Sequence, residues 1–200
     1  MEGLVGGKII LGAGLAAITL FLLTRSFAGE GGKRASTIMK GTKGMNLATA
    51  TFAAGCFWHV EDSFRTVEGV VSTEVGYEGG KPDHPTYSDV CTDRTGHAEV
   101  VKIQYDPSKV TYGKLLEKFF EIHDPTTVNR QGPDVGTQYR SVIFYHSPEQ
   151  KEQAYAYRAE LERTKRYSRP VATEIVPAST FWKAEEYHQQ YYEKERGESQ

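Results

Sequence analysis

The sequence predicts an α/β (α+β) domain in which helices pack on a mixed β-sheet as a two-layer sandwich. Segments with strand and helix patterns alternate from about residue 46 onward. One of them carries the apolar stripe of a core-facing helix. The chain of 200 residues is also long enough to bury one stable core without disulfide bonds. The pattern does not define the order of the strands.

The N-terminal segment differs from the rest, and we assign residues 1–28 to a signal or membrane anchor. Residues 9–23 are apolar and uncharged, with Lys8 before them and Arg25 after them. That length fits a cleaved signal peptide, and Ser26-Phe27-Ala28 would serve as its cleavage site. Basic residues after the apolar run could equally hold it as an uncleaved anchor. The protein is then membrane-anchored or exported, with a cytoplasmic location as the alternative.

The remaining chain divides into a linker and one domain. Residues 29–45 are rich in Gly, Lys and Ser without an apolar period, which is typical of a flexible linker. Residues 46–200 form the predicted catalytic domain and contain no internal repeat.

The first half of the domain predicts three strands and two helices. Strand patterns cover 48–54, 69–77 and 99–105, and a helix can begin at Phe57, after Gly55 ends the first strand. The clearest helix follows Thr111, a plausible N-cap. Its apolar residues repeat at helical spacing on one face: Tyr112, Leu115, Leu116, Phe119 and Phe120.

The second half of the domain predicts two more strands and two more helices. Strands are expected at 139–145 and 171–176, and a last helix at about 184–193. Ser147-Pro148-Glu149-Gln150 gives an N-cap, a proline at the first helical position and a capping-box glutamine. The helix that they start should run to about residue 165.

Composition excludes several classes of function. The formal net charge of −2 provides no field for nucleic acid. The two cysteines, Cys56 and Cys91, are too few for a disulfide framework and form no CxxC pair. The motifs of nucleotide-binding loops, zinc proteases and lipases are absent from the sequence.

Cys56 is a candidate nucleophile because it lies between a strand and a helix. A helix N-terminus lowers the pKa of a thiol through its exposed N–H groups and its dipole. Phe57 and Trp58 follow directly and offer an apolar surface suited to a small group such as a methyl. The alternative is an inert buried cysteine, which is the commoner role of this residue type.

Two further features are weaker on their own. Glu99 opens a strand after a turn-like segment, so a strand end could direct its carboxyl into a cleft. His97 lies beside it, but no nearby spacing supplies the further ligands that a metal would need. The polar segment 123–140 is long for a surface loop, and such loops commonly bind ligands or move.

Taken together, the motifs resemble the A-type peptide methionine sulfoxide reductases over roughly residues 47–192. The matching segments occur in the same order and spacing: GCFW at 55–58, VGYEGG at 75–80, PTYSDVC at 85–91, TGHAEVV at 95–101, HDPTT at 123–127 and NRQGPDVGTQYRS at 129–141. The resemblance implies a ferredoxin-like core, a monomer without a bound cofactor, and reduction of the S epimer of methionine sulfoxide in oxidised proteins and peptides.

The resemblance also implies a role for each site residue. The Cys56 thiolate attacks the sulfoxide sulfur and becomes a sulfenic acid, while Glu99 protonates the oxygen. Burial in an apolar pocket would raise the pKa of Glu99 and keep it protonated. Tyr87 and Tyr139 would hydrogen-bond the oxygen. The other implied substrate-binding residues are Phe57 and Trp58, for the methyl group, and Asp134, for the polar network.

Regeneration of Cys56 is left open between two routes. Many members of the family carry a resolving cysteine near the C-terminus, and here Cys91 is the second and last cysteine of the sequence. Either thioredoxin or another dithiol reduces Cys56 directly, which we expect, or Cys91 resolves it through an internal disulfide.

Two other functions remain as alternatives. A cysteine hydrolase would pair Cys56 with a base drawn from the six histidines, at positions 59, 84, 97, 123, 146 and 188. A membrane-tethered thiol redox sensor would be oxidised at Cys56 without turning over a substrate.

Overall fold

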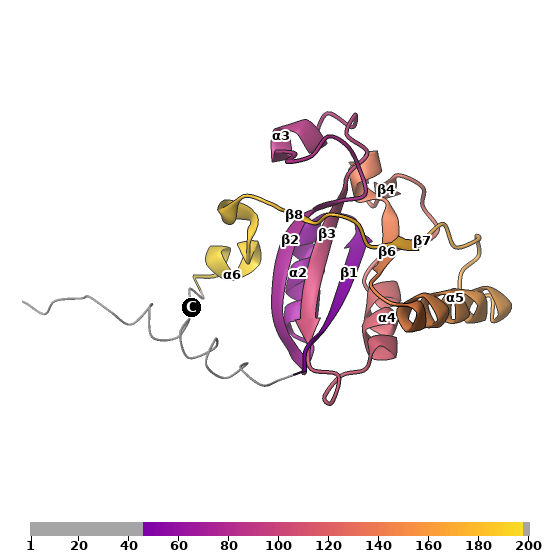
Figure 1. Cartoon of the computed structure of the whole chain (residues 1–200). Coiled ribbons are helices and arrows are strands. Elements are labelled where there is room, and N and C mark those ends of the chain that lie inside the picture. Colours follow the sequence, from indigo (N-terminus) through magenta and orange to yellow (C-terminus); the bar gives the residue numbers. More distant parts are fainter. Residues whose placement is uncertain (1–45, 198–200) are drawn as a thin grey trace, which may run out of the picture.

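A computed structural model describes residues 46–197 and contains one six-stranded sheet (Figure 1). Its strands, in spatial order, are β7 (Glu174–Pro177), β6 (Ser141–Tyr145), β1 (Ala48–Ala54), β3 (Ala98–Tyr105), β2 (Val70–Glu78) and β8 (Trp182–Lys183). β6 and β7 pair in parallel, and every other neighbouring pair is antiparallel. The mixed sheet that we predicted is therefore confirmed.

The inner strands have the order of a ferredoxin-like fold. β1 is followed by helix α2 (Phe57–Arg65) and β2, and β3 by helix α4 (Tyr112–Glu121) and β6. The two strands of each unit are not neighbours in the sheet. β3 lies between β1 and β2, and β1 lies between β3 and β6, which gives the order β6-β1-β3-β2. The pairing of β1 with β3 and β6 brings the ends of these strands together beside Cys56.

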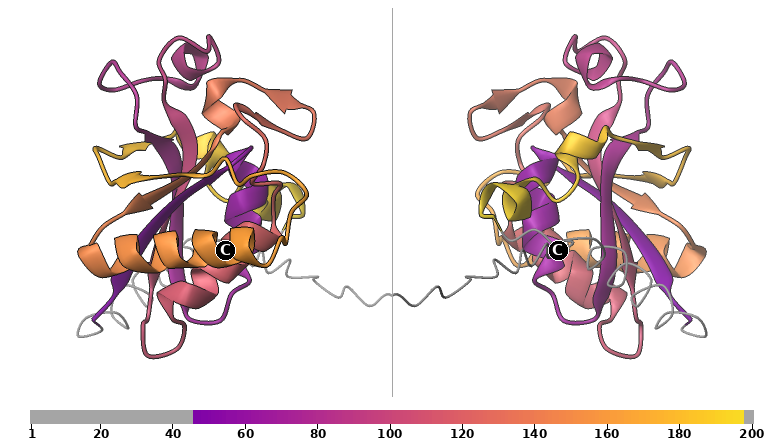
Figure 2. Two further views of the ribbon diagram at one scale, coloured as in Figure 1. Left: turned by 90° about the vertical axis from the view of Figure 1, so that its right-hand side faces the viewer. Right: turned by 90° about the vertical axis from the view of Figure 1, so that its left-hand side faces the viewer.

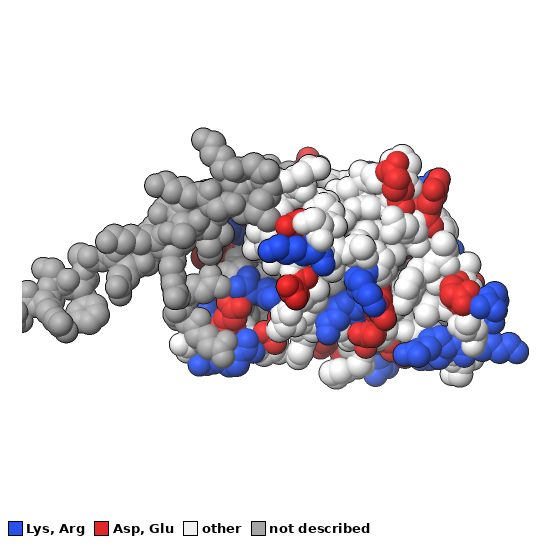
Figure 3. Space-filling view, turned by 90° about the horizontal axis from the view of Figure 1, so that it is seen from below, with Lys and Arg blue, Asp and Glu red and all other residues white. Residues whose placement is uncertain are grey.

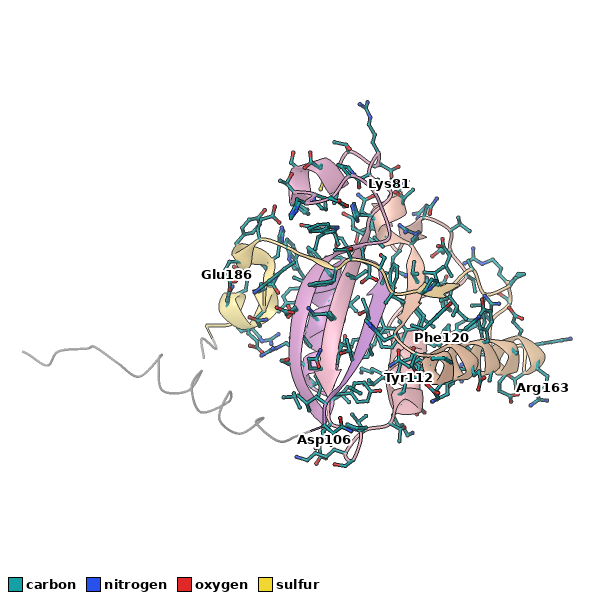
Figure 4. All side chains as sticks on the ribbon, viewed as in Figure 1. Lys81, Asp106, Tyr112, Phe120, Arg163 and Glu186 are labelled. Atoms are coloured by element: carbon teal, nitrogen blue, oxygen red, sulfur yellow. The ribbon has the colours of Figure 1, made fainter. Side chains whose placement is uncertain are left out.

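Helices cover one face of the sheet, with α5 (Pro148–Arg163) beside α4 (Figures 1 and 2). Side chains at alternate positions of β1, such as Phe52, are fully buried against α2 and α4. The predicted stripe of α4 lies in this core, and Figure 4 labels Tyr112 and Phe120 along it. The Thr111 hydroxyl accepts a hydrogen bond from the Lys114 N–H, so the predicted cap is confirmed.

The opposite face of the sheet carries a smaller apolar cluster. It contains Ala53, Ala98, Val100, Val142 and Phe144, covered by side chains that include Phe181. Gly76 of β2 lies so close to this cover that an added Cβ would meet the Phe181 ring at 2.5 Å. The segment between β7 and β8 therefore takes the place of a second helical layer.

Three short elements of the structure were not predicted from the sequence. They are helix α3 (Tyr87–Val90), the hairpin of β4 (Arg130–Gln131) with β5 (Asp134–Val135), and the 3-10 turn η1 (Thr137–Tyr139). The hairpin and η1 lie in the polar segment that we expected to be a long loop, and η1 takes the first residue of the predicted strand 139–145.

The last predicted helix is wrong, because the chain is broken into the 3-10 turn η2 (Glu186–His188) and α6 (Tyr191–Glu195). Gln189 between them inserts its amide into β2, accepting from the Val75 N–H and donating to the Val75 carbonyl, each at 2.9 Å. Gln190 adopts a left-handed conformation with φ 48°. The buried amide contacts outweigh the local helical pattern.

The surface seen from below mixes charges of both signs (Figure 3). No helix within residues 46–197 is long and apolar enough to span a membrane. The predicted signal or anchor and the linker lie outside the described residues.

Candidate active site

Cys56 lies at the junction of β1 and α2 and forms the N-cap of that helix. Gly55 before it has φ +95°, and an added Cβ there would meet the Gln131 side chain at 2.7 Å. A glycine is therefore required both for the turn and for the close approach of β4. The result is a half-buried thiol directly before the first turn of α2.

Glu99 is a carboxylic acid bound to this junction, and its side chain is almost completely buried. Residue exposure is 2%, and Oε2 accepts a hydrogen bond from the Phe57 N–H at 3.0 Å. The pKa of Glu99 is raised to about 8, mainly by burial and with a smaller contribution from the charge of Asp134, against the opposing effect of the Phe57 N–H. At neutral pH the carboxyl is thus mainly protonated and can act as an acid.

The expected lowering of the Cys56 pKa is wrong for the free enzyme. The N–H groups of Trp58 and His59 do lower it, as expected at a helix N-terminus. However, burial and then the charge of Glu99 outweigh them and raise the Cys56 pKa to about 11. The effect of Glu99 vanishes when that carboxyl is protonated, so the two groups titrate as a pair.

Trp58 is fixed in place by aromatic neighbours from the C-terminal segment. Its ring stacks on Tyr191 with centroids 3.9 Å apart and planes 9° apart. Its Nε1–H donates to His188 Nδ1 at 3.0 Å. Trp58 is half-buried, whereas Phe57 is only 1% exposed and packs in the core. Trp58 therefore offers a larger accessible surface than Phe57.

The predicted tyrosines lie within electrostatic reach of the same carboxyl. Burial raises the pKa of Tyr139 to about 12, with further contributions from Glu99 and Asp134. The pKa of Tyr87 is also raised. Burial is the largest cause, the hydrogen bond with the Cys91 side chain is the next, and the charge of Glu99 contributes as well. The structure thus brings these groups together around Glu99, and Cys91 joins them at an exposed position.

A cavity of about 390 Å³ adjoins Cys56 on the side of the β4–β5 hairpin. Asp134 lines it together with Cys56, while Val60 and Ile122 provide apolar surface. Asp134 is therefore shared between this cavity and the electrostatic surroundings of Glu99.

Sequence reasoning missed the residues that hold the site from the C-terminal segment. Glu185 accepts hydrogen bonds from the Tyr87 N–H at 2.9 Å and from the Tyr77 hydroxyl at 3.0 Å. His188 and Tyr191 flank Trp58. The polar and aromatic run AEEYHQQYY at 184–192 was the available signal, but we interpreted it as a plain helix.

Within residues 46–197, no group of three or more His, Cys, Asp or Glu side chains could hold a metal ion. His97, the residue considered beside Glu99, uses its ring nitrogens elsewhere. Nδ1 accepts from the Gly80 N–H at 3.2 Å, and Nε2 lies 2.9 Å from the Pro82 carbonyl.

Comparison with known proteins agrees with this geometry. The family model for peptide methionine sulfoxide reductase matches residues 48–200. Peptide methionine sulfoxide reductase MsrA of Acidobacterium capsulatum is 63% identical over 148 residues, which cover 74% of this chain and 95% of that protein.

Solved structures show the same fold. Mxr1 from Saccharomyces cerevisiae in its reduced form is 38% identical with a TM-score of 0.71, covering 75% of this chain and 86% of that one. Mxr1 in complex with Trx2 is 27% identical with a TM-score of 0.52, covering 72% of this chain and 84% of that one.

Proposed function

The chain belongs to the peptide methionine sulfoxide reductase family, and from that premise we propose how Cys56 and Glu99 carry out its reaction. The enzyme reduces methionine sulfoxide to methionine and is regenerated by a thioredoxin. The observation that carries the proposal is the buried Glu99 carboxyl held to the backbone of the residue after Cys56, where burial raises its pKa.

In the first step the Cys56 sulfur bonds to the sulfoxide sulfur while Glu99 transfers its proton to the oxygen. The sulfur–oxygen bond of the substrate then breaks, and the hydroxyl passes to Cys56. Methionine leaves with its sulfur reduced, and Cys56 is left as a sulfenic acid. The Glu99 carboxylate regains a proton from solvent, so charge and atoms balance.

Substrate binding in this proposal uses the exposed surface of Trp58. Stacking on Tyr191 and the hydrogen bond to His188 hold the indole in one orientation. An apolar ring beside the thiol favours the methyl group. Phe57 contributes its buried ring to the floor and its N–H to Glu99.

The sulfoxide oxygen needs hydrogen-bond donors as negative charge develops on it. We assign this role to the hydroxyls of Tyr87 and Tyr139, whose raised pKa values keep them protonated donors at neutral pH. Asp134 completes the polar surroundings, and its charge helps to keep Glu99 protonated.

The reductant is an external thiol in this proposal. A relative, Mxr1, is known in complex with Trx2, which supports a thioredoxin. Cys91 provides the alternative, because it lies near Tyr87 at the rim of the site. Turnover of Cys91→Ser with thioredoxin tests the routes: full activity supports direct reduction, and loss of turnover after a normal first methionine supports an internal disulfide.

The hydrolase and sensor alternatives are not favoured. A buried carboxyl of raised pKa, Glu99, is held to the residue after Cys56, and the matching family and relatives are methionine sulfoxide reductases. A purified enzyme given a methionine sulfoxide peptide and thioredoxin should release methionine continuously. Absence of methionine, or full activity in Cys56→Ser, would refute the proposed function.

We propose further that residues 9–23 direct the protein to a membrane, as a cleaved signal or a retained anchor, and that the enzyme is a monomer. The charge pattern on both sides of the apolar run supports the first part. Fractionation of cells and the mass of the N-terminus of the purified protein test it. Intact protein found only in the soluble cytoplasmic fraction would refute membrane targeting.

A further inference from the structure

We propose that His59 is a catalytic base for regeneration, taking the proton of the reductant thiol as that thiol attacks oxidised Cys56 from the cavity beside α2. The inference rests on the proposed function, because it starts from the Cys56 sulfenic acid. It concerns the second half of the cycle, in which Glu99 is not the base.

The cavity provides a second approach to Cys56. Its volume of about 390 Å³ is enough for a small thiol or an extended loop of a partner. Glu99, Trp58 and Tyr139 are not part of its wall. The lining includes Cys56, His59, Val60, Gln131, Pro133 and Asp134.

The chemistry of the second step requires such an approach. Displacement at a sulfenic acid sulfur places the incoming sulfur opposite the departing oxygen, as in thiol exchange at a disulfide. That oxygen was protonated by Glu99 and therefore lies toward Glu99, which is not among the residues that line the cavity. A thiol in the cavity would approach Cys56 from a side that Glu99 does not line.

His59 is the imidazole on this wall. It follows Trp58 in the first turn of α2, and its own N–H points at the Cys56 sulfur. Its ring is exposed, with Nε2 2.8 Å from the Tyr192 hydroxyl. Burial raises the pKa of Tyr192, and the charge of Cys56 raises it further.

This arrangement suits a base. Nε2 is the nearer ring nitrogen to the Tyr192 oxygen, at 2.8 Å against 3.5 Å for Nδ1. When Nε2–H donates to that oxygen, Nδ1 keeps its lone pair and can accept a proton. An imidazole is the side chain that exchanges protons most readily near neutral pH. Tyr192 would then stabilise the imidazolium that forms, and is a positioning residue in this step.

The thiol proton passes to His59, and the thiolate forms a disulfide with Cys56 while the Cys56 sulfur–oxygen bond breaks. The oxygen leaves as hydroxide and takes a proton from Glu99 to become water. One proton passes through solvent from the His59 imidazolium to the Glu99 carboxylate. The sum is one thiol and one sulfenic acid giving one disulfide and one water.

The test separates the two half-reactions in the full-length enzyme. The methionine formed without reductant in a single turnover reports the proposed function. Enzyme oxidised in this way is then mixed with dithiothreitol, whose thiols are mostly protonated at neutral pH, or with thionitrobenzoate, which is already a thiolate. His59→Gln keeps a polar side chain at this position, and His84→Gln, at an exposed histidine that contacts Trp182, is the matched control.

We expect His59→Gln to slow capture by dithiothreitol about 100-fold, the lower end of the range for loss of a general base. Capture of thionitrobenzoate should change less than threefold, because this reagent has no proton to give. Tyr192→Phe should show a smaller loss with dithiothreitol only, and His84→Gln none.

Three results would overturn the inference: no loss with dithiothreitol in His59→Gln, an equal loss with both reagents, or loss of its first-step methionine. A wild-type enzyme that forms no first methionine would instead refute the proposed function itself.

Discussion

Replacing Glu99 by glutamine should remove the proton donor while leaving its place in the structure filled. The amide can still accept the hydrogen bond from the Phe57 N–H, which now joins Glu99 Oε2 at 3.0 Å. Loss of a general acid typically costs about 100-fold to 10,000-fold in rate. We expect a loss in this range in the rate constant for the first methionine.

The pH dependence of this step follows from the pair of groups. The reactive form has a Cys56 thiolate and a protonated Glu99, one proton fewer than the fully protonated pair. The pKa of Glu99 is raised to about 8 and that of Cys56 to about 11. The pair therefore loses its first proton near pH 8 and its second near pH 11. The fully protonated form therefore dominates at neutral pH.

We expect kcat/KM for methionine formation to rise about tenfold per pH unit below about pH 8 and then to level, since kcat/KM reports the free enzyme. Rapid quenching with quantification of methionine across this range measures it. A wild-type rate that falls between about pH 6 and 8, or a Glu99→Gln rate within threefold of wild type, would refute the assignment.

Three further predictions concern the pocket and the stability of the fold. Trp58→Ala should lower kcat/KM about tenfold to 100-fold through the lost methyl contact, with Trp58→Phe intermediate; equal rates in all three would remove Trp58 from the pocket. Glu61→Ala should lower the free energy of unfolding by about 3 kcal/mol in urea titrations, because it leaves the buried Thr73 hydroxyl and Gln190 N–H without their acceptor. The exposed control Glu68→Ala should change it by less than about 0.5 kcal/mol, and equal losses would contradict the account. Because burial raises the pKa of Glu99 from 4.5 to about 8, the stability that it contributes is complete below pH 4.5 and is lost as pH rises to about 8. This decline in the free energy of unfolding amounts to at most about 5 kcal/mol. Glu99→Gln should reduce it, and a variant with the same pH profile of unfolding as the wild type would contradict the prediction.

The main elements of the fold were predictable because their signals are local. The stripe of α4, its Thr111 cap and the Ser147 cap of α5 each follow from a few neighbouring residues, and all are confirmed. The capping-box role of Gln150 is wrong, because its side chain accepts from the His146 N–H at 2.8 Å and donates to the Thr49 carbonyl at 2.7 Å instead. A tertiary contact thus replaced a local one.

The site was predictable in its residues but not in its electrostatics. The position of Cys56 before a helix follows from Gly55 and the pattern around it, and the structure confirms this junction. The raised pKa of Cys56 depends on burial and on Glu99 from another strand, which no local pattern contains. The same holds for the support of Tyr87 by Glu185, since these residues are far apart in the sequence.

In this mechanism Cys56 itself takes the oxygen from the substrate. The most direct measurement is a single turnover of a methionine sulfoxide peptide with the reduced enzyme and no added reductant. We expect one methionine per enzyme and the mass of one added oxygen atom on the peptide that contains Cys56, trapped by a sulfenic acid reagent. Methionine formed without oxidation of Cys56, or formed equally by Cys56→Ser, would contradict the account.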